Sequence, residues 1–291
     1  MPFNQHRGQT GQGGGGGGGG VWCMIGGGNM GRSIAHAALD SGDLGRFIVA
    51  ERDGPSRERL ECDSCESATK AMEWLIEREN PREPSPIVLA VKPQMLTELA
   101  MELRAFFEDR SRVVVSVLAG TPGAKVRGLL GTNARVVRTM PNLPAAIRLS
   151  CTAICVSAGA HAGDEDFAME LFRAVGPTVL RIPEELMDAF TAVAGSGPAY
   201  LFYLAEAMTK AAVKLGFDAK TADAAVRATL FGASAMLKDD PRTAEALRAA
   251  VTSKGGTTAA ATARLDSSGV PASIVKAIEA ACERGRELAT M

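Results

Sequence analysis

The sequence predicts an α/β fold, in which a doubly wound parallel sheet is followed by an all-α domain. Three observations lead to this prediction. Short, continuous apolar runs alternate with helical patterns in the first part of the chain, as strands buried on both faces require. A glycine-rich turn joins the first apolar run to the first helical pattern. Beyond Pro183 the chain changes to Ala-rich helical segments without strand signals, so we place a domain boundary there.

These observations divide the 291 residues into three parts. Residues 1–20 are polar and end in a pure glycine run, Gly13 to Gly20. Such a segment has little to bury and much backbone entropy to lose, so we predict a disordered tail. Residues 21–182 are predicted to form the sheet domain, and residues 183–291 the helical domain.

The first apolar run, Val21 to Ile25, enters a turn that fits G-x-G-x-x-G with Gly26, Gly28 and Gly31, and a helix from Arg32 to Leu39 follows. This order is typical of a Rossmann-type dinucleotide site: the first glycine permits the tight turn, the second lets backbone approach a pyrophosphate, and the third lets helix pack against strand. The helix N-terminus adds N–H groups and a positive dipole end. The run from Gly13 to Gly20 would match any glycine motif by chance. The prediction of a dinucleotide site therefore depends on the apolar strand, Val21 to Ile25, between that run and the turn. A structural βα turn without ligand is the alternative.

The second predicted strand, Phe47 to Ala50, ends at charged residues about 20 positions beyond the glycine turn, where a dinucleotide fold meets the adenosine ribose. Glu51 could accept the two ribose hydroxyls of NAD, whereas Arg52 could pair with the 2′-phosphate of NADP. The two charges do not decide between the coenzymes. A solvated charged turn is the alternative interpretation.

Further buried strands and their helices complete the predicted sheet. The strands are expected at residues 87–91, 113–118, 135–138, 153–156 and 177–182, and helical patterns occupy residues 64–79 and 165–175. Ligands of such sheets bind beyond the carboxyl ends of the strands. Small or polar residues follow three of these strands and are the expected cofactor rim: Ala90 to Pro93, Ala119 to Gly120, and Met140 to Asn142.

The helical domain is predicted to open with a helix around residues 186–193, to break at Gly195 to Pro198, and to continue with helices at residues 199–215, 220–238 and 259–265. The helix at 220–238 carries small residues on much of its circumference, which indicates close packing on several sides. A helical domain of about a hundred residues does not readily supply that packing alone. We therefore predict that these helices complete their core against a second subunit.

A second candidate site precedes the helix at 259–265. The loop Thr252-Ser253-Lys254-Gly255-Gly256-Thr257-Thr258 brings hydroxyls and glycine N–H groups to a helix N-terminus. Such an arrangement binds anions, and a carboxylate would suit it. The alternative is an ordinary glycine linker with Thr258 as the N-cap.

Composition excludes several other classes of protein. The formal net charge of −1 gives no electrostatic reason to expect nucleic acid or an anionic membrane as partner. No apolar run reaches the roughly 18 residues that span a bilayer, and the N-terminus lacks the apolar core of a secretory signal, so we expect a cytoplasmic protein. The six cysteines are scattered; Cys62 and Cys65 form C-x-x-C between acidic neighbours, and no second such pair exists. We predict no metal site.

Six motifs, in order along nearly the whole chain, resemble those of the Δ1-pyrroline-5-carboxylate reductase family. They are I-G-G-G-N-M-G at 25–31, A-V-K-P at 90–93, S-V-L-A-G at 116–120, R-T-M-P-N at 138–142, G-S-G-P-A-Y at 195–200 and T-S-K-G-G-T-T at 252–258. The first is shared by many dehydrogenases, and the last two together are specific to this family. The resemblance implies an NAD(P)H-dependent enzyme that reduces the C=N bond of Δ1-pyrroline-5-carboxylate to L-proline. It also implies a Rossmann domain, a helical dimerisation domain, and a homodimer or a ring of dimers.

The resemblance also implies site residues. The last motif would hold the carboxylate and ring nitrogen of a small-molecule substrate through Ser253, Gly255, Gly256, Thr257 and Thr258. Together with the turn and rim residues, the expected contacts to NADPH or NADH are Gly26, Gly28, Asn29, Met30, Gly31, Glu51, Arg52, Ala90, Val91, Lys92, Pro93, Ala119, Gly120 and Asn142. The chain departs from the family pattern at Lys254 (usually proline), Leu143 (usually threonine) and Ala249 (often aspartate). Of these, Lys254 adds a cation beside the expected carboxylate site.

Reduction of a cyclic imine needs a hydride donor, a fixed pose and a proton on nitrogen, but no strong nucleophile. The histidines, His6, His36 and His161, lie away from the predicted rim, so they are poor candidates for the acid. We predict that amides around the 255–258 turn fix the carboxylate and that Thr258 is the catalytic residue, through a hydrogen bond to the ring nitrogen. Lys92 is the other candidate acid, but a lysine at a strand end beside the cofactor is better suited to hold ribose or phosphate.

Two other functions stay open from the residues alone. A β-hydroxyacid-type dehydrogenase would need a catalytic lysine in the first long helix of the second domain, and Lys210 lies at the wrong end of its segment. A non-catalytic dinucleotide-binding protein would keep the glycine turn but would lose the pattern of the loop from Ser253 to Thr258. The intact residues 255–258 argue against that alternative.

Overall fold

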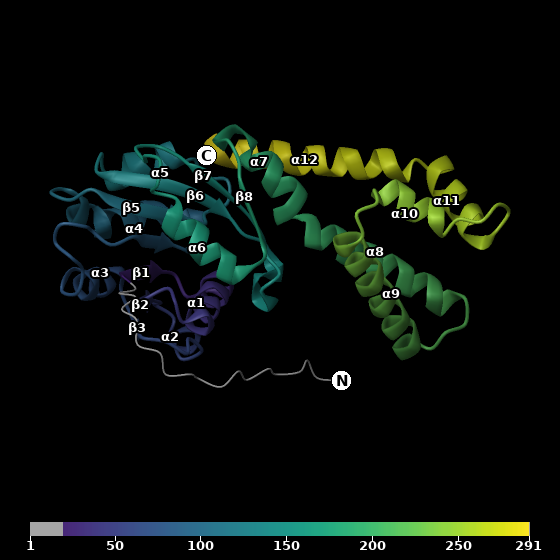
Figure 1. The fold of residues 1–291 in the computed structure, drawn as a ribbon, viewed down its shortest axis with the longest axis horizontal. Coiled ribbons are helices and arrows are strands. Elements are labelled where there is room, and N and C mark those ends of the chain that lie inside the picture. Colours follow the sequence, from purple (N-terminus) through teal and green to yellow (C-terminus); the bar gives the residue numbers. More distant parts are fainter. Residues whose placement is uncertain (1–19, 291) are drawn as a thin grey trace.

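The computed structural model describes residues 20–290, so the predicted tail lies, apart from Gly20, outside the described residues. One eight-stranded sheet, with the order β3-β2-β1-β4-β5-β6-β7-β8, occupies one part of the molecule, and a helical arm extends from it (Figure 1). Its strands are β1 (Val21–Ile25), β2 (Arg46–Ala50), β3 (Ser64–Cys65), β4 (Ile87–Leu89), β5 (Arg112–Ser116), β6 (Ala134–Met140), β7 (Cys151–Val156) and β8 (Thr178–Arg181).

The sheet is parallel except at one pair. Following the order in the sheet, every neighbouring pair from β3 to β6 is parallel, and β7 and β8 are parallel to each other. The pair β6 and β7 is antiparallel. The connection between β6 and β7, residues 141–150, contains only the 3₁₀ turn η3 (Leu143–Ile147). A parallel crossover needs about a dozen residues or more, so this short connection turns the chain back instead. The predicted α/β class is confirmed, with this one reversal added.

Helices cover both faces of the sheet, as a doubly wound fold requires. They are α1 (Asn29–Ser41), α2 (Gly54–Arg57), α3 (Ala68–Ile76), η1 (Pro93–Met95), α4 (Leu96–Leu103), η2 (Arg104–Phe107), α5 (Gly123–Leu130) and α6 (Asp166–Val175). Successive side chains of β1 point to opposite faces of the sheet. Cys23 and Ile25 pack with α3, α4 and α5 on one face, and Trp22 and Met24 pack with α1 and α6 on the other. The sheet domain therefore has a core on each side.

Two details near the sheet edge differ from expectation. Residues 64–79 do not form one helix, because Ser64–Cys65 pairs with β2 as β3. Helix α3 starts only after Ser67, whose Oγ accepts a hydrogen bond from the Lys70 N–H at 3.2 Å. A two-residue strand leaves no alternating pattern in the sequence, which is why periodicity missed it.

The helical part contains η4 (Glu184–Leu186), α7 (Met187–Phe190), η5 (Thr191–Gly195), α8 (Gly197–Lys214), α9 (Ala219–Asp239), α10 (Ala244–Ala250), α11 (Thr257–Ser267) and α12 (Val270–Thr290). The predicted break at residues 195–198 is reduced to Ser196, which separates the π-helical turn η5 from α8. Pro198 fits there because the first turn of a helix has no backbone partner for its N–H. The short α10 and the last helix, α12, lie outside the predicted helix ranges.

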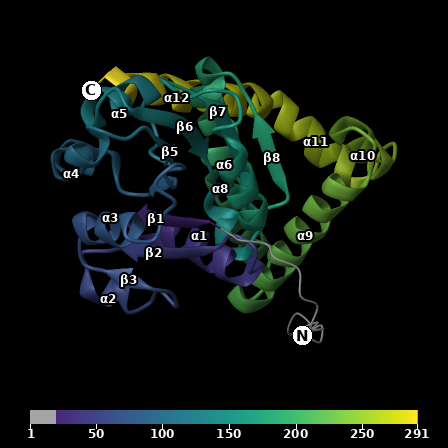
Figure 2. The same cartoon turned by 60° about the vertical axis from the view of Figure 1, so that its left-hand side comes forward.

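The last helix returns to the sheet domain, as Figures 1 and 2 both show. α12 packs against α7 and η5. Near its end, Leu288 lies so close to the β5–α5 turn that a Cβ on Gly120 would be 3.0 Å from the Leu288 Cβ. Gly120 has a φ of +61°, so both its conformation and this contact favour glycine.

The middle helices of the arm bury little. No residue of α8 is buried, and exposed aromatic side chains include Phe202, Tyr203 and Phe231, the last two 76% and 68% exposed. Large exposed apolar surfaces of this kind mark interaction sites. In the part of the chain from 20 to 290, each helix lacks the length or the apolar character needed for a bilayer crossing.

Candidate active site

The glycine turn between β1 and α1 has the geometry that its sequence predicts. Gly26 has a φ of +109°, and a Cβ there would lie 2.5 Å from the Ala90 carbonyl oxygen. A Cβ on Gly31 would lie 2.0 Å from the Gly26 carbonyl oxygen, so the close packing of α1 on the turn needs glycine. A Cβ on Gly28 would meet no atom within 4 Å. The first and third glycines are thus required by packing, and the second leaves an open approach to the start of α1.

Next to this turn lies a cleft of about 310 Å³. It is bounded by the carboxyl ends of β1, β2 and β4 and by the first turns of α3 and α4. The predicted cofactor residues that line it are Gly26, Gly28, Glu51, Arg52, Ala90, Val91 and Lys92. Its other lining residues include the apolar Leu99 and Met95 and the polar Ser56 and Ser67. A mostly apolar cleft with a few polar groups, at the carboxyl ends of parallel strands, fits the adenosine part of a dinucleotide.

Two more predicted residues follow the lining residue Gly28 directly along the chain. Asn29 and Met30 begin α1, directly after the open Gly28, and α1 has no side-chain cap. The backbone N–H groups of a first helical turn have no partner within the helix. These donors and the helix dipole suit a pyrophosphate, which needs both N–H groups and positive potential.

The Glu51 carboxylate is fixed at the end of β2. Its Oε2 accepts a hydrogen bond from the Gly27 N–H at 2.8 Å, and its Oε1 accepts one from the Asp53 N–H at 2.9 Å. Each carboxylate oxygen can accept more than one hydrogen bond, so both can still receive a ribose hydroxyl. Glu51 is therefore a pre-positioned acceptor that lines the cleft.

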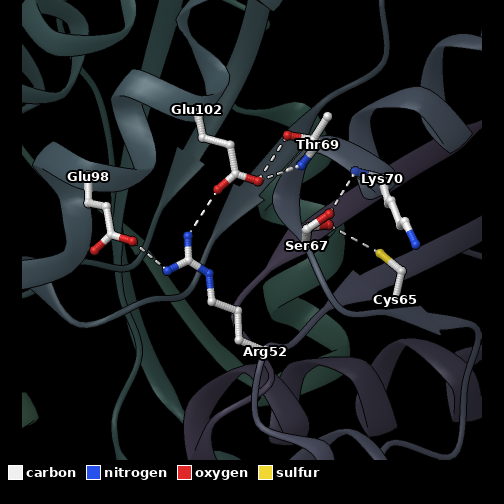
Figure 3. Close-up of polar contacts among 7 residues, drawn as sticks. All are labelled: Arg52, Cys65, Ser67, Thr69, Lys70, Glu98 and Glu102. Atoms are coloured by element: carbon white, nitrogen blue, oxygen red, sulfur yellow. Dashed lines mark hydrogen bonds and ion pairs between the residues drawn. The ribbon is translucent and has the colours of Figure 1, made fainter.

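Arg52 reaches across to helix α4 rather than into open space, as Figure 3 shows. Its Nη1 lies 2.6 Å from Glu98 Oε1, and its Nη2 lies 3.0 Å from Glu102 Oε2. The other carboxylate oxygen of Glu102 accepts hydrogen bonds from the N–H and the hydroxyl of Thr69, at 2.9 and 3.0 Å. Neither glutamate was predicted as a partner of Arg52, because they lie 46 and 50 residues away in the sequence and belong to no motif.

The remaining predicted rim residues do not line the cleft. Pro93 begins η1, Ala119 is exposed, and Gly120 packs against α12. The Asn142 side chain is held within the protein: its Nδ2 donates to the Ala194 carbonyl at 3.0 Å, and its Oδ1 accepts from the Cys151 N–H at 3.1 Å. Asn142 thereby ties the end of β6 to η5, at the junction of the sheet and the helical arm.

The second predicted site lies at the start of α11. Gly256 is the N-cap, and neither it nor any neighbour caps the helix with a side chain. Thr258, the alternative cap, lies inside the first turn. Gly255 has a φ of +73°, and a Cβ on Gly256 would lie 2.5 Å from the Ser253 Oγ. The turn therefore needs both glycines and presents uncapped N–H groups beside the exposed Ser253 and Thr257.

The two sites do not meet within one chain. In Figures 1 and 2, the α10–α11 turn lies at the far end of the helical arm from β1, β2 and α3. The structure thus brings the nucleotide-side residues together around one cleft and the residues 253–258 together around one helix start. It leaves these two groups apart.

The C-x-x-C pair shows no feature of a reactive or metal-binding site. Burial raises the pKa of Cys62 to about 11, and the neighbouring Asp63 carboxylate adds to this effect. No group of three or more His, Cys, Asp or Glu side chains within residues 20–290 is placed to hold a metal ion.

A dinucleotide-type glycine turn on a doubly wound sheet, followed by a helical arm, defines a two-domain nicotinamide-dependent oxidoreductase. Residues 184–288 match the family model for pyrroline-5-carboxylate reductase dimerisation, and residues 22–120 match the family model for NADP oxidoreductase, coenzyme F420-dependent. The chain belongs to the pyrroline-5-carboxylate reductase family.

Individual relatives agree with this assignment. The chain is 35% identical to the pyrroline-5-carboxylate reductase of Haemophilus influenzae, over 92% of this chain and 97% of that protein. It is 40% identical to pyrroline-5-carboxylate reductase 2 of Bacillus subtilis, over 69% of this chain and 72% of that protein. The solved structure of a pyrroline-5-carboxylate reductase from Coxiella burnetii superimposes with a TM-score of 0.81 at 29% identity, covering 93% of this chain and 98% of that one. These likenesses extend over both domains.

Proposed function

We propose that this chain transfers a hydride from NADPH or NADH to the imine carbon of Δ1-pyrroline-5-carboxylate, whose ring nitrogen is protonated, and so forms L-proline. The observation that carries the proposal is the pairing, in one chain, of an open glycine turn beside a cleft that fits the adenosine part of a dinucleotide with an uncapped helix start suited to a carboxylate. Membership of the reductase family supports the substrate. No geometric feature favours a β-hydroxyacid substrate.

Each part of the coenzyme has a candidate partner. The pyrophosphate is expected at Gly28 and the N–H groups of Asn29 and Met30, because that side of the turn is open. The adenosine ribose is expected at Glu51, and the strand end from Ala90 to Pro93 is expected to run along the coenzyme. When bound, the reduced nicotinamide supplies the hydride. The roles of Gly120 and Asn142 are to shape the neighbouring turns, since their contacts lie within the protein.

The substrate is expected at the turn before α11. The N–H groups of Gly255 and Thr257, with the Ser253 hydroxyl, can hold a carboxylate at the positive end of the helix dipole, while the Gly256 N–H donates to the Ser253 carbonyl at 3.0 Å and shapes the turn. Thr258 then donates or accepts the hydrogen bond at the ring nitrogen that keeps the imine carbon facing the coenzyme. Orientation and exclusion of water supply most of the rate enhancement in such a site.

We propose that the complete site forms between two copies of the chain. The loop at 253–258 and the nucleotide cleft lie apart within one chain, and the helices between them leave aromatic side chains exposed. Pairing of α8 and α9 with a second copy would cover these side chains and bring the loop of one copy to the cleft of the other. A homodimer, or a ring of such dimers, meets this requirement.

Two further assignments complete the proposal. The chain divides into a nucleotide-binding domain at residues 21–182 and a substrate and dimerisation domain at residues 183–291. The enzyme works in the cytoplasm, where a chain with six free cysteines, among them the buried Cys23 and Cys155, keeps them reduced.

The direct test is the initial rate of coenzyme oxidation with pyrroline-5-carboxylate, measured separately for NADPH and NADH. We expect turnover with at least one coenzyme, and L-proline as the product. Folded protein that binds coenzyme but turns over neither would contradict the proposal. Light scattering on the same sample gives the oligomeric state, and a single-chain mass with full activity would contradict the shared site.

A further inference from the structure

Arg52 is the cation at the adenosine end of the cleft, and both of its charged contacts are carboxylates. Figure 3 shows its guanidinium between Glu98 and Glu102, one helical turn apart on α4. The two ion pairs measure 2.6 and 3.0 Å. The hydrogen bonds to Glu98 and then Glu102 raise the pKa of Arg52, so the guanidinium is charged and engaged.

The two glutamates are held to different degrees. Glu102 is 22% exposed and is anchored by Thr69 as well as by Arg52. Burial raises the pKa of Glu102, but the hydrogen bonds from Thr69 and Arg52 outweigh this effect, and the pKa lies below its ordinary value. Glu102 is therefore an ionised, fixed carboxylate. Glu98 is 64% exposed and contacts only Arg52, so its ion pair costs little to break.

Of the other cations near this end of the cleft, Lys70 is paired with a carboxylate, whereas Arg57 and Arg59 donate to neutral oxygens and keep their full charge. Arg57 donates to the Glu51 carbonyl at 2.9 Å, Arg59 donates to the Ser56 Oγ at 3.0 Å, and Lys70 pairs with Glu66. Lys92 also lines the cleft, but it follows β4, and β1 separates β4 from β2.

A 2′-phosphate bound to Arg52 would lie close to the two carboxylates that already pair with Arg52, Glu98 and Glu102, and to Glu51 in the cleft lining. It carries close to two negative charges, and like charges close together oppose binding. A free 2′-hydroxyl has no such conflict, and it can donate a hydrogen bond to the fixed Glu51 carboxylate. Specificity arises from such repulsive elements as much as from attractive ones.

We infer that Glu98 and Glu102 determine the coenzyme preference of this site: they occupy Arg52, add negative charge where a 2′-phosphate would lie, and shift the preference toward NADH. The inference rests on the proposed function in that it concerns the coenzyme of the same reaction. Arg52 is the kind of cation that can bind the 2′-phosphate of NADP. Here the Glu98 and Glu102 carboxylates on α4 neutralise its charge.

The test uses Glu98→Gln, Glu102→Gln and the double variant in the full-length enzyme. Glutamine keeps an oxygen that can accept from Thr69, so the E102Q change removes charge and leaves that contact possible. Glu83→Gln is the matched control, because Glu83 is exposed and lies before β4, at the opposite end of the strands. Titration calorimetry compares adenosine 2′,5′-bisphosphate with 5′-AMP, which differ only in the 2′-phosphate.

We expect the affinity ratio of the bisphosphate to 5′-AMP to rise about three-fold in E98Q and about ten-fold or more in the double variant, with no change in E83Q. The ratio of kcat/KM for NADPH to that for NADH rises in the same order. Arg52→Ala added to the double variant removes the gain, whereas alone it changes the ratio much less. A ratio in the double variant that stays within two-fold of the parent, or falls, overturns the inference.

The two readouts separate this inference from the proposed function. Fragment binding needs no turnover, so it reports on Glu98 and Glu102 even in an enzyme that reduces another imine. Conversely, turnover of pyrroline-5-carboxylate with an unchanged fragment ratio supports the reductase and overturns the role of α4.

Discussion

The sheet domain and the helical arm bury their side chains to very different extents. Residues 20–182 contain two cores, one on each face of the sheet. After residue 183, the buried apolar side chains among the described residues are Met187, Ala192, Ala222 and Val226. Two of these lie next to the sheet domain, in α7 and η5. We therefore expect the first region to fold on its own contacts and the arm to require contacts with a surface outside it.

The largest expected effect is on the sheet domain's own stability. Glu79 is buried and receives hydrogen bonds from Arg112 Nη2 at 2.7 Å, Arg110 Nη1 at 2.9 Å and the Ser85 N–H at 2.9 Å. Glu79→Ala leaves the fully buried Arg112 guanidinium without its counter-charge, and we expect a loss of about 3–5 kcal/mol in the free energy of unfolding. Urea titration measures it.

The control for this prediction is Glu77→Ala, since Glu77 is 70% exposed and pairs only with the neighbouring Arg78. It should cost less than about 0.5 kcal/mol. Equal losses in the two variants would mean that the buried pair is not what holds this edge of the sheet together.

The arm should respond in the opposite way, through assembly. Phe231 on α9 is 68% exposed in the single chain. Phe231→Glu would place a charge in the contact that we propose between copies, so we expect light scattering to give the mass of one chain and the reductase activity to be lost. Met101→Glu, at a 74% exposed position on α4 of the sheet domain, should leave the mass unchanged. If F231E retained the parental mass, α9 would not be part of the contact.

Thr258, the residue that we propose for catalysis, lies on the helical arm, in α11. Thr258→Ala removes the hydroxyl that we propose for the ring nitrogen, and we expect kcat/KM to fall about ten- to a hundred-fold, or about 1.4–2.7 kcal/mol. Thr262→Ala is the matched control one turn later in α11, where the hydroxyl bonds only to helix carbonyls. Equal kinetics for T258A and the parent enzyme would exclude Thr258 from the reaction.

Local patterns predicted most of the sheet domain, and long-range contacts account for what they missed. The turn at Gly26, Gly28 and Gly31 was predictable because the whole glycine spacing lies within six consecutive residues, although the contact that requires Gly26 is with the distant Ala90. The reversal at β7 depends on the length of one connection and on the neighbour that β7 finds. The Arg52 contacts to α4 bridge about 50 residues, and nothing in the sequence between them indicates the pairing. Coenzyme discrimination was therefore the part of the site that the sequence left open.

The smallest expected effect lies at the joint between the two regions. Glu184, the first residue of η4, accepts hydrogen bonds from the Gly123 N–H at 2.9 Å, from Arg138 Nη1 at 3.1 Å and from the Ser157 hydroxyl. Burial raises the pKa of Glu184, but the bonds from Ser157, Gly123 and Arg138 outweigh it, so the pKa lies below its ordinary value of 4.5.

A depressed carboxyl pKa means that the unfolded chain takes up its proton first as pH falls. The stability that Glu184 contributes is therefore complete well above pH 4.5 and is lost as the pH falls through the lower folded-state value. We expect Glu184→Gln to cost about 1 kcal/mol at pH 7, and the difference in Tm between variant and parent to shrink toward pH 3.5. A difference that grew on acidification would mean that the Glu184 carboxylate is not the group that joins the arm to the sheet.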